Sequence, residues 1–160
     1  MNKIAMIAMG AFATMGMTTA ATAETWTPAS TTSSLSGALQ VSKLLGPFNC
    51  GVSGSISTPA GSGNASLTSL ALTAGDSTCT SITFTGGPWA VEGVPGSPKK
   101  VKIKNLGVNG ITGNCKGDLE GTYLGGGQIQ FVNVTLPRTS GLGDCKINGT
   151  IATSPALDFS

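Results

Sequence analysis

The sequence predicts an all-β domain, a disulfide-stapled β-sandwich of jelly-roll type built from two duplicated β-units. Short segments that alternate apolar and polar residues recur along the chain, and clusters of Gly, Pro, Asn and Asp separate them. The four cysteines enclose two intervals of nearly equal length, Cys50 to Cys79 and Cys115 to Cys145. Because the strands are short and no helical period is present, two packed sheets are the expected architecture.

The two cysteine intervals also share an apolar pattern. Each keeps the two-residue period of a strand, slips by one residue, and then resumes, which is typical of a β-bulge. The same slip in both intervals favours duplication over chance similarity between two Ser/Thr/Gly-rich strands. The matching positions are Ala65, Leu67, Leu70 and Leu72 in the first interval and Ile129, Phe131, Val134 and Leu136 in the second, 64 positions later.

Eight strands are expected, in two repeat units that cover about 35–89 and 100–157. An irregular stretch from Gly86 to Pro98 links the units. Turn residues, for example Gly46-Pro47 and Gly125-Gly126-Gly127, end the individual strands. In chain order the expected strands are 35–45, 50–57, 65–73, 79–85, 100–104, 118–124, 128–136 and 145–153.

The N-terminal residues 1–23 have the pattern of a signal peptide. Lys3 gives a positive start, 4–17 is apolar, and Ala21-Thr22-Ala23 is a small-residue cleavage site. The apolar run is shorter than the roughly 20 residues that cross a bilayer, so no transmembrane segment is expected. Residues 24–34 predict an extended or flexible arm, and 35–160 a single domain. The mature protein is therefore expected to be secreted.

Four cysteines in a secreted chain of this size predict two disulfides, for which three pairings exist. Sequence order favours Cys50 with Cys79 and Cys115 with Cys145, because the first and third strands of a meander begin at the same end of the sheet. A metal site is disfavoured, since the chain has no histidine and no C-x-x-C spacing. No cofactor is expected.

The charge pattern excludes several classes of partner. Charged residues are only 10% of the chain, far below the usual quarter. After removal of the signal peptide, eight basic residues face seven acidic ones, so nucleic-acid binding is not indicated. A polar surface with little charge repulsion instead favours self-association or contact with an interface.

The residue inventory argues against catalysis. Without histidine, neither a Ser-His-Asp nor a Cys-His arrangement can form. Asp118 and Glu120 share one face of a strand about 7 Å apart, but acids on a polar strand are ordinary surface residues. We therefore expect a protein that is not an enzyme.

The best candidates for a contact surface are Trp26 on the arm and Pro88 and Trp89 on the linking stretch. An exposed indole can insert into an oil, lipid or glycan surface while its N–H stays hydrated. The alternative for Trp89 is a plug in the core.

Lysines form a second candidate surface, because Lys100, Lys102 and Lys104 share one strand face. They could bind an acidic polysaccharide or a lipopolysaccharide phosphate. The alternatives are a solvated face and an edge strand protected by lysine.

Several short motifs resemble a bacterial family, the secreted Pra-type activators of alkane oxidation of Gram-negative bacteria. The resemblance covers most of the chain from about Leu35 onward. It implies a small extracellular or cell-surface protein, not an enzyme, that promotes contact with or use of hydrocarbon and contributes to biofilm adhesion. The motifs are Asn49-Cys50, Gly87-Pro88-Trp89, Gly113-Asn114-Cys115-Lys116-Gly117, Cys145-Lys146-Ile147-Asn148-Gly149 and Ser154-Pro155-Ala156-Leu157.

An alternative function is a structural subunit of an extracellular filament. In that case the arm and the strand 35–45 would pair with an open sheet edge of a neighbouring molecule, since an unpaired edge offers main-chain donors and acceptors.

Overall fold

The computed structural model describes residues 24–160, and these residues form eleven strands and a single 3-10 turn, η1 (Cys79–Ser81). The predicted all-β class is confirmed. The expected signal peptide lies outside the described residues. In chain order the strands are β1 Trp26–Thr27, β2 Thr32–Lys43, β3 Gly46–Ser57, β4 Ala65–Gly75, β5 Thr83–Thr85, β6 Trp89–Val94, β7 Lys100–Gly110, β8 Gly113–Gly125, β9 Gln128–Leu136, β10 Cys145–Ser154 and β11 Asp158–Phe159.

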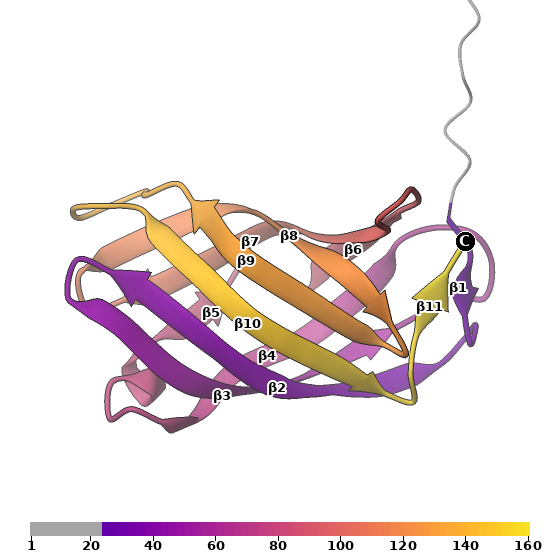
Figure 1. The fold of residues 1–160 in the computed structure, drawn as a ribbon, viewed down its shortest axis with the longest axis horizontal. Helices are drawn as coiled ribbons and strands as arrows, with labels where there is room; N and C mark the ends of the chain where they lie inside the picture. Colours follow the sequence, from indigo (N-terminus) through magenta and orange to yellow (C-terminus); the bar gives the residue numbers. More distant parts are fainter. Residues whose placement is uncertain (1–23) are drawn as a thin grey trace, which may run out of the picture.

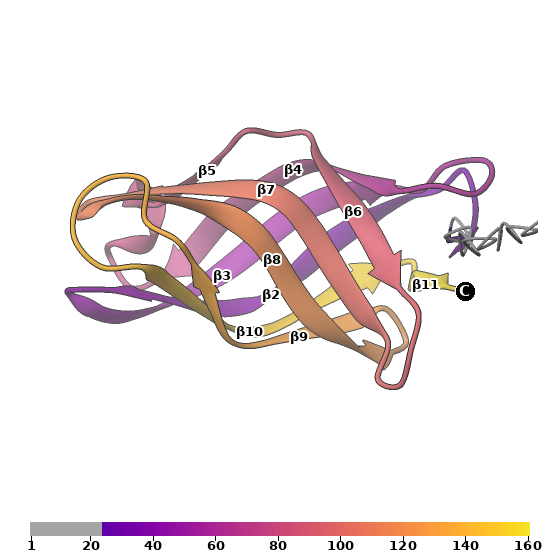
Figure 2. The same cartoon turned by 90° about the horizontal axis from the view of Figure 1, so that it is seen from above.

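The main strands form a closed antiparallel barrel (Figures 1 and 2). From β2 to β10, consecutive strands pair with one another except around β5 and β6. These two short strands share one position in the barrel wall, because both pair with β7, and β4 pairs with β6. The sheet closes where β10 pairs with β2 over nine positions, from Lys146 opposite Ser42 to Ser154 opposite Ser34. The expected two-sheet sandwich of jelly-roll type is therefore wrong, because one continuous sheet joins both halves. Pairing between the first and last long strands has no local signal in the sequence.

The predicted bulges and disulfides are confirmed. The register of β4 against β3 shifts between Leu67 and Ser69, and that of β9 against β10 shifts between Phe131 and Val134. Both cysteine pairs connect as sequence order favours, with Cα–Cα distances of 5.6 and 6.1 Å. The expected strand 79–85 differs, since it begins as η1 and only Thr83–Thr85 is extended. The linking stretch also contains a strand, β6, that the sequence did not indicate.

The barrel interior is filled with side chains, as in other narrow eight-stranded barrels. Inward positions alternate along each strand, for example Leu35, Leu39 and Val41 on β2. The ring of Phe131 lies against Gly121, where a Cβ would collide with it. The interior is therefore a packed core.

One end of the barrel, the aromatic end, is closed by the short β1–β11 sheet (Figure 1, right). The rings of Trp26 and Tyr123 lie 5.2 and 5.4 Å from that of Phe159, and the Tyr123 hydroxyl donates to the Leu157 carbonyl at 2.9 Å. Residues 24–34 are thus part of the fold. Of the two alternatives for the arm, extended or flexible, the extended one agrees with β1 and with the first residues of β2. The strand that was expected to pair with a neighbouring molecule is also occupied, since β2 pairs with β3 and β10.

Candidate functional site

Exposed apolar side chains gather at the end of the barrel opposite to the aromatic end. Six large apolar residues of the described chain are exposed, and four of them lie here. Leu44 and Leu45 form the β2–β3 turn, Ile111 lies in the β7–β8 turn, and Leu142 lies in the β9–β10 loop; they are 60–67% exposed. We call these four residues the apolar end. The other two lie elsewhere. Leu124 is in the β8–β9 hairpin at the aromatic end, and Val132 is on the outer wall, in β9.

Main-chain contacts hold the loops of the apolar end together. The Thr139 N–H donates to the Asn114 carbonyl at 2.8 Å, and the Asn114 N–H donates to the Ser140 carbonyl at 3.2 Å. Gly143 lies against Leu44, where a Cβ would come within 3.3 Å of the Leu44 side chain. Both disulfides join segments near this end of the barrel. The four apolar side chains are thus displayed from a braced set of turns.

A small pocket of about 30 Å³ opens beside these turns. Its walls are mainly apolar, and Leu45 and Ile111 belong both to the pocket and to the apolar end. A pocket of this size holds about two water molecules or a group of similar size, not a whole ligand. The remaining lining residues are Val41, Lys43, Phe48, Thr78, Ile82, Val108, Gly110, Thr112, Gly113 and Cys145.

Both tryptophans are buried, so neither is the exposed contact for which the sequence offered it as a candidate. Trp26 is 3% exposed and Trp89 is 5% exposed. The Trp89 indole N–H donates to the Thr85 carbonyl at 3.1 Å, and its ring lies against Gly87. The alternative of a core plug describes Trp89 correctly. Pro88 alone of the three residues is exposed.

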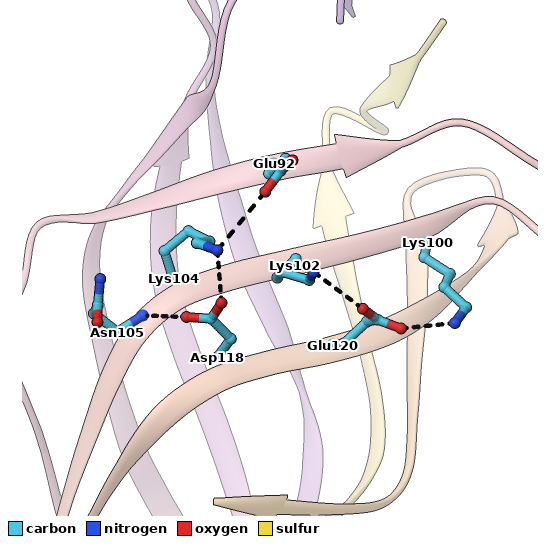
Figure 3. Close-up of polar contacts among 7 residues, drawn as sticks. All are labelled: Glu92, Lys100, Lys102, Lys104, Asn105, Asp118 and Glu120. Atoms are coloured by element: carbon cyan, nitrogen blue, oxygen red, sulfur yellow. Dashed lines mark hydrogen bonds and ion pairs between the residues drawn. The ribbon is translucent and has the colours of Figure 1, made fainter. Parts of the chain in front are cut away.

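The lysine stripe is present but is paired with carboxylates (Figure 3). Lys100 and Lys102 contact the two oxygens of Glu120 at 2.7 and 3.4 Å. Lys104 contacts Asp118 at 2.6 Å, and Glu92 lies 4.0 Å away. Because β7 lies between β6 and β8, these lysines do not protect an edge strand. They form a solvated, internally neutralised face.

Asp118 has a structural role in this face. The register of β7 against β8 shifts between Ile103 and Leu106, and Asn105 in this bulge has a φ of 54°. One Asp118 oxygen accepts the Asn105 N–H at 2.9 Å while the other accepts Lys104. The hydrogen bond from Lys104 lowers the pKa of Asp118, and the hydrogen bond from Lys100 lowers the pKa of Glu120. Both carboxylates are held ionised, which is opposite to what a general acid requires.

We expect Asp118→Asn to destabilise the fold by about 0.5–1 kcal/mol at neutral pH, since the pair is largely exposed to solvent. Asparagine can still accept the Asn105 N–H, so the change isolates the charge. Because the pKa of Asp118 is lower in the folded than in the unfolded protein, its ionised form stabilises the fold at every pH above the unfolded-state pKa of about 3.9. This stabilisation is lost as the pH falls through the folded-state pKa. Denaturant unfolding of both proteins should therefore converge in acid. A difference that stays constant with pH would contradict the role of the charge.

None of the four residues of the apolar end is among the contact residues that the sequence predicts. Leu44 and Leu45 belong to the expected strand 35–45, and Ile111 and Leu142 lie outside the expected strands. A usable signal is present in the sequence, because all four stand within two residues of a glycine, a residue typical of turns, where a packed apolar side chain is not expected.

Two other features, a cluster of metal ligands and a membrane-spanning helix, are absent from the part of the chain that the structure describes. No three His, Cys, Asp or Glu side chains of residues 24–160 gather as metal ligands. The same residues include no helix with the length and apolar character needed to cross a membrane.

The geometry defines a small barrel protein, stapled by two disulfides, with one closed aromatic end and one exposed apolar end. Over residues 1–160 the sequence matches the family described as alkane oxidation protein activator PraA/PraB-like. The chain belongs to this family, which confirms the resemblance seen in its motifs. No curated protein and no solved structure matches the chain.

Proposed function

We propose that this protein is a secreted activator of alkane use that acts by binding hydrophobic surfaces through its apolar end. The observation that carries the proposal is the gathering of four of the six exposed large apolar side chains on three neighbouring turns. A soluble surface rarely concentrates such residues without an interaction partner. The family description as an activator of alkane oxidation supports a hydrocarbon as that partner.

The apolar end offers enough surface for adsorption. Full burial of one Leu or Ile side chain contributes roughly 1.5–3 kcal/mol, and these side chains are already about one third covered. Four of them therefore contribute roughly 4–8 kcal/mol before the cost of immobilising the protein. Because that cost is of similar size, we expect adsorption of a single molecule to be reversible, and adsorption of linked copies to be firmer.

The test compares two sets of exposed residues in adsorption to hexadecane droplets. Leu44→Ser, Leu45→Ser and Ile111→Ser together should lower adsorption by about 100-fold, since each change removes roughly 1 kcal/mol or more of apolar burial. The control is Leu124→Ser with Val132→Ser, which removes two apolar side chains of comparable exposure, 52 and 65%, elsewhere on the barrel. All five positions are exposed, so each change should alter stability by less than about 0.5 kcal/mol. Equal adsorption of the triple variant and the control would contradict the proposal.

We further propose that the protein acts without catalysis. The support is that Asp118 and Glu120, the candidate acids of the sequence, are both engaged by lysines and held ionised. Secretion is supported by the two disulfides, which persist in oxidising compartments.

We also propose that the protein contributes to adhesion and self-association, and a neutral face on the barrel wall supports this role. The outward positions of β2, β3 and β10 carry almost only Ser, Thr, Asn, Gln, Ala and Gly, with Lys146 as their one charge. Ser36, for example, lies between Ser53 and Ala152. Copies of such a face meet without charge repulsion, so cell aggregation should accompany surface adsorption.

The filament alternative has less support. Strand addition needs a free donor strand and an open edge, whereas β2 is paired along both sides. Among the described strands, β4 beyond Leu67 has no partner on the side of β5. This stretch is one place where a strand could still add.

A further inference from the structure

The unpaired positive charges of the barrel gather at the apolar end. Of the eight basic residues between 24 and 160, the four lysines at 99, 100, 102 and 104 form ion pairs. The other four have no carboxylate within 4.0 Å among the described residues, and all lie in or within four residues of the turns that carry the apolar side chains. They are Lys43, Lys116, Arg138 and Lys146.

The acidic residues are distributed differently. Asp76 and Asp144 are the two acids at this end, and they accept the main-chain N–H groups of Asn49 and Arg138 at 2.7 and 3.0 Å. Four basic and two acidic residues give this end a charge of +2. The rest of residues 24–160 has four basic and five acidic residues, a charge of −1. The barrel is therefore polarised along its axis.

Two of the unpaired cations flank one surface hollow. Lys43 and Lys146 both line a depression of about 380 Å³ next to Leu44. The Lys43 ammonium donates to the Ser140 carbonyl at 3.2 Å, which places its charge over the β9–β10 loop. Asp144 also lines the hollow, and one of its oxygens is engaged by the Arg138 N–H.

We propose that the apolar end binds a lipid layer with negatively charged head groups. Leu44, Leu45, Ile111 and Leu142 enter the apolar part of the layer, and Lys43 and Lys146 hold an anionic head group in the hollow beside Leu44. Bare hydrocarbon offers no partner for these cations, whereas an anionic lipid matches both the apolar cap and its charged rim. This inference rests on the proposed use of the apolar end and names the surface on which it acts.

The test measures binding to vesicles of phosphatidylglycerol mixed with phosphatidylcholine and to vesicles of phosphatidylcholine alone. The natural protein should prefer the anionic vesicles, and added salt should abolish the preference because it screens exposed charges. Lys43→Gln with Lys146→Gln should weaken binding to anionic vesicles by about 25-fold, at about fivefold for each basic residue near the surface. Lys100→Gln with Lys102→Gln removes the same charge from the paired face and should have little effect.

Two outcomes would overturn the proposal: equal binding of natural protein to both vesicles, or equal losses in the two double variants. Failure here is separable from failure of the proposed function. Lys43→Gln with Lys146→Gln should adsorb to hexadecane droplets as the natural protein does, since droplets carry no head groups. If Lys43→Gln with Lys146→Gln keeps anionic binding while the triple variant of Leu44, Leu45 and Ile111 loses droplet adsorption, the lipid inference fails and the hydrocarbon role stands.

Discussion

Replacing Trp89 with alanine is expected to destabilise the barrel by about 3–5 kcal/mol, the usual cost of removing a large buried aromatic side chain. The ring is 5% exposed, packs against Gly87, and donates its N–H to the Thr85 carbonyl. Its loss leaves a cavity at the start of β6 and a carbonyl without its donor. Denaturant unfolding followed by circular dichroism measures the change.

Ala90→Ser provides the matched control, because Ala90 is adjacent to Trp89 in sequence but exposed. It should alter stability by less than about 1 kcal/mol and leave droplet adsorption unchanged. A Trp89→Ala protein that keeps its stability but no longer adsorbs would return the indole to the contact surface and contradict its structural role.

Removing the second disulfide, as Cys115→Ala with Cys145→Ala, should cost about 3–4 kcal/mol, because the bond closes a loop of 30 residues. The effect should be local as well as global. The bond joins the start of β8 to the start of β10, and the 137–144 loop that carries Leu142 ends there. Thermal unfolding gives the stability, and limited proteolysis of this loop reports its loosening.

The comparison for this change is Cys50→Ala with Cys79→Ala. This variant removes the first disulfide, which closes a loop of almost the same length. Both double variants should lose similar stability, but only the first should expose the 137–144 loop to protease. Equal cleavage of this loop in both variants would show that the second disulfide does not brace it.

The local structure was predictable because strands and bulges leave a periodic signal. The slip between Leu67 and Leu70 appears in the structure as a register shift of β4, and the slip at Phe131 appears in β9. The closure of the barrel was not predictable in this way. It depends on pairing between β2 and β10, which are more than 100 residues apart, and alternation along each strand is the same in a sandwich and in a barrel.

The candidate site was predictable only in part. For Trp89 the sequence left an exposed contact and a core plug both open, and only the structure decides between them, because the Trp89 ring folds back against Gly87. The lysines at 100, 102 and 104 and the acids at 118 and 120 were both recognised, but their neutralisation depends on the register of β7 against β8. The apolar end was missed because three separate turns contribute to it, and only the folded barrel brings them together.

The most direct test of the central claim is hydroxyl-radical footprinting of the natural protein, free and adsorbed to hexadecane droplets. Mass spectrometry then compares oxidation at the six exposed large apolar residues. If the apolar end is the contact surface, adsorption should protect its four residues from oxidation, namely Leu44, Leu45, Ile111 and Leu142. Leu124 and Val132 should be oxidised as in the free protein. Protection of Leu124 or Val132 with continued oxidation of the apolar end would contradict the account.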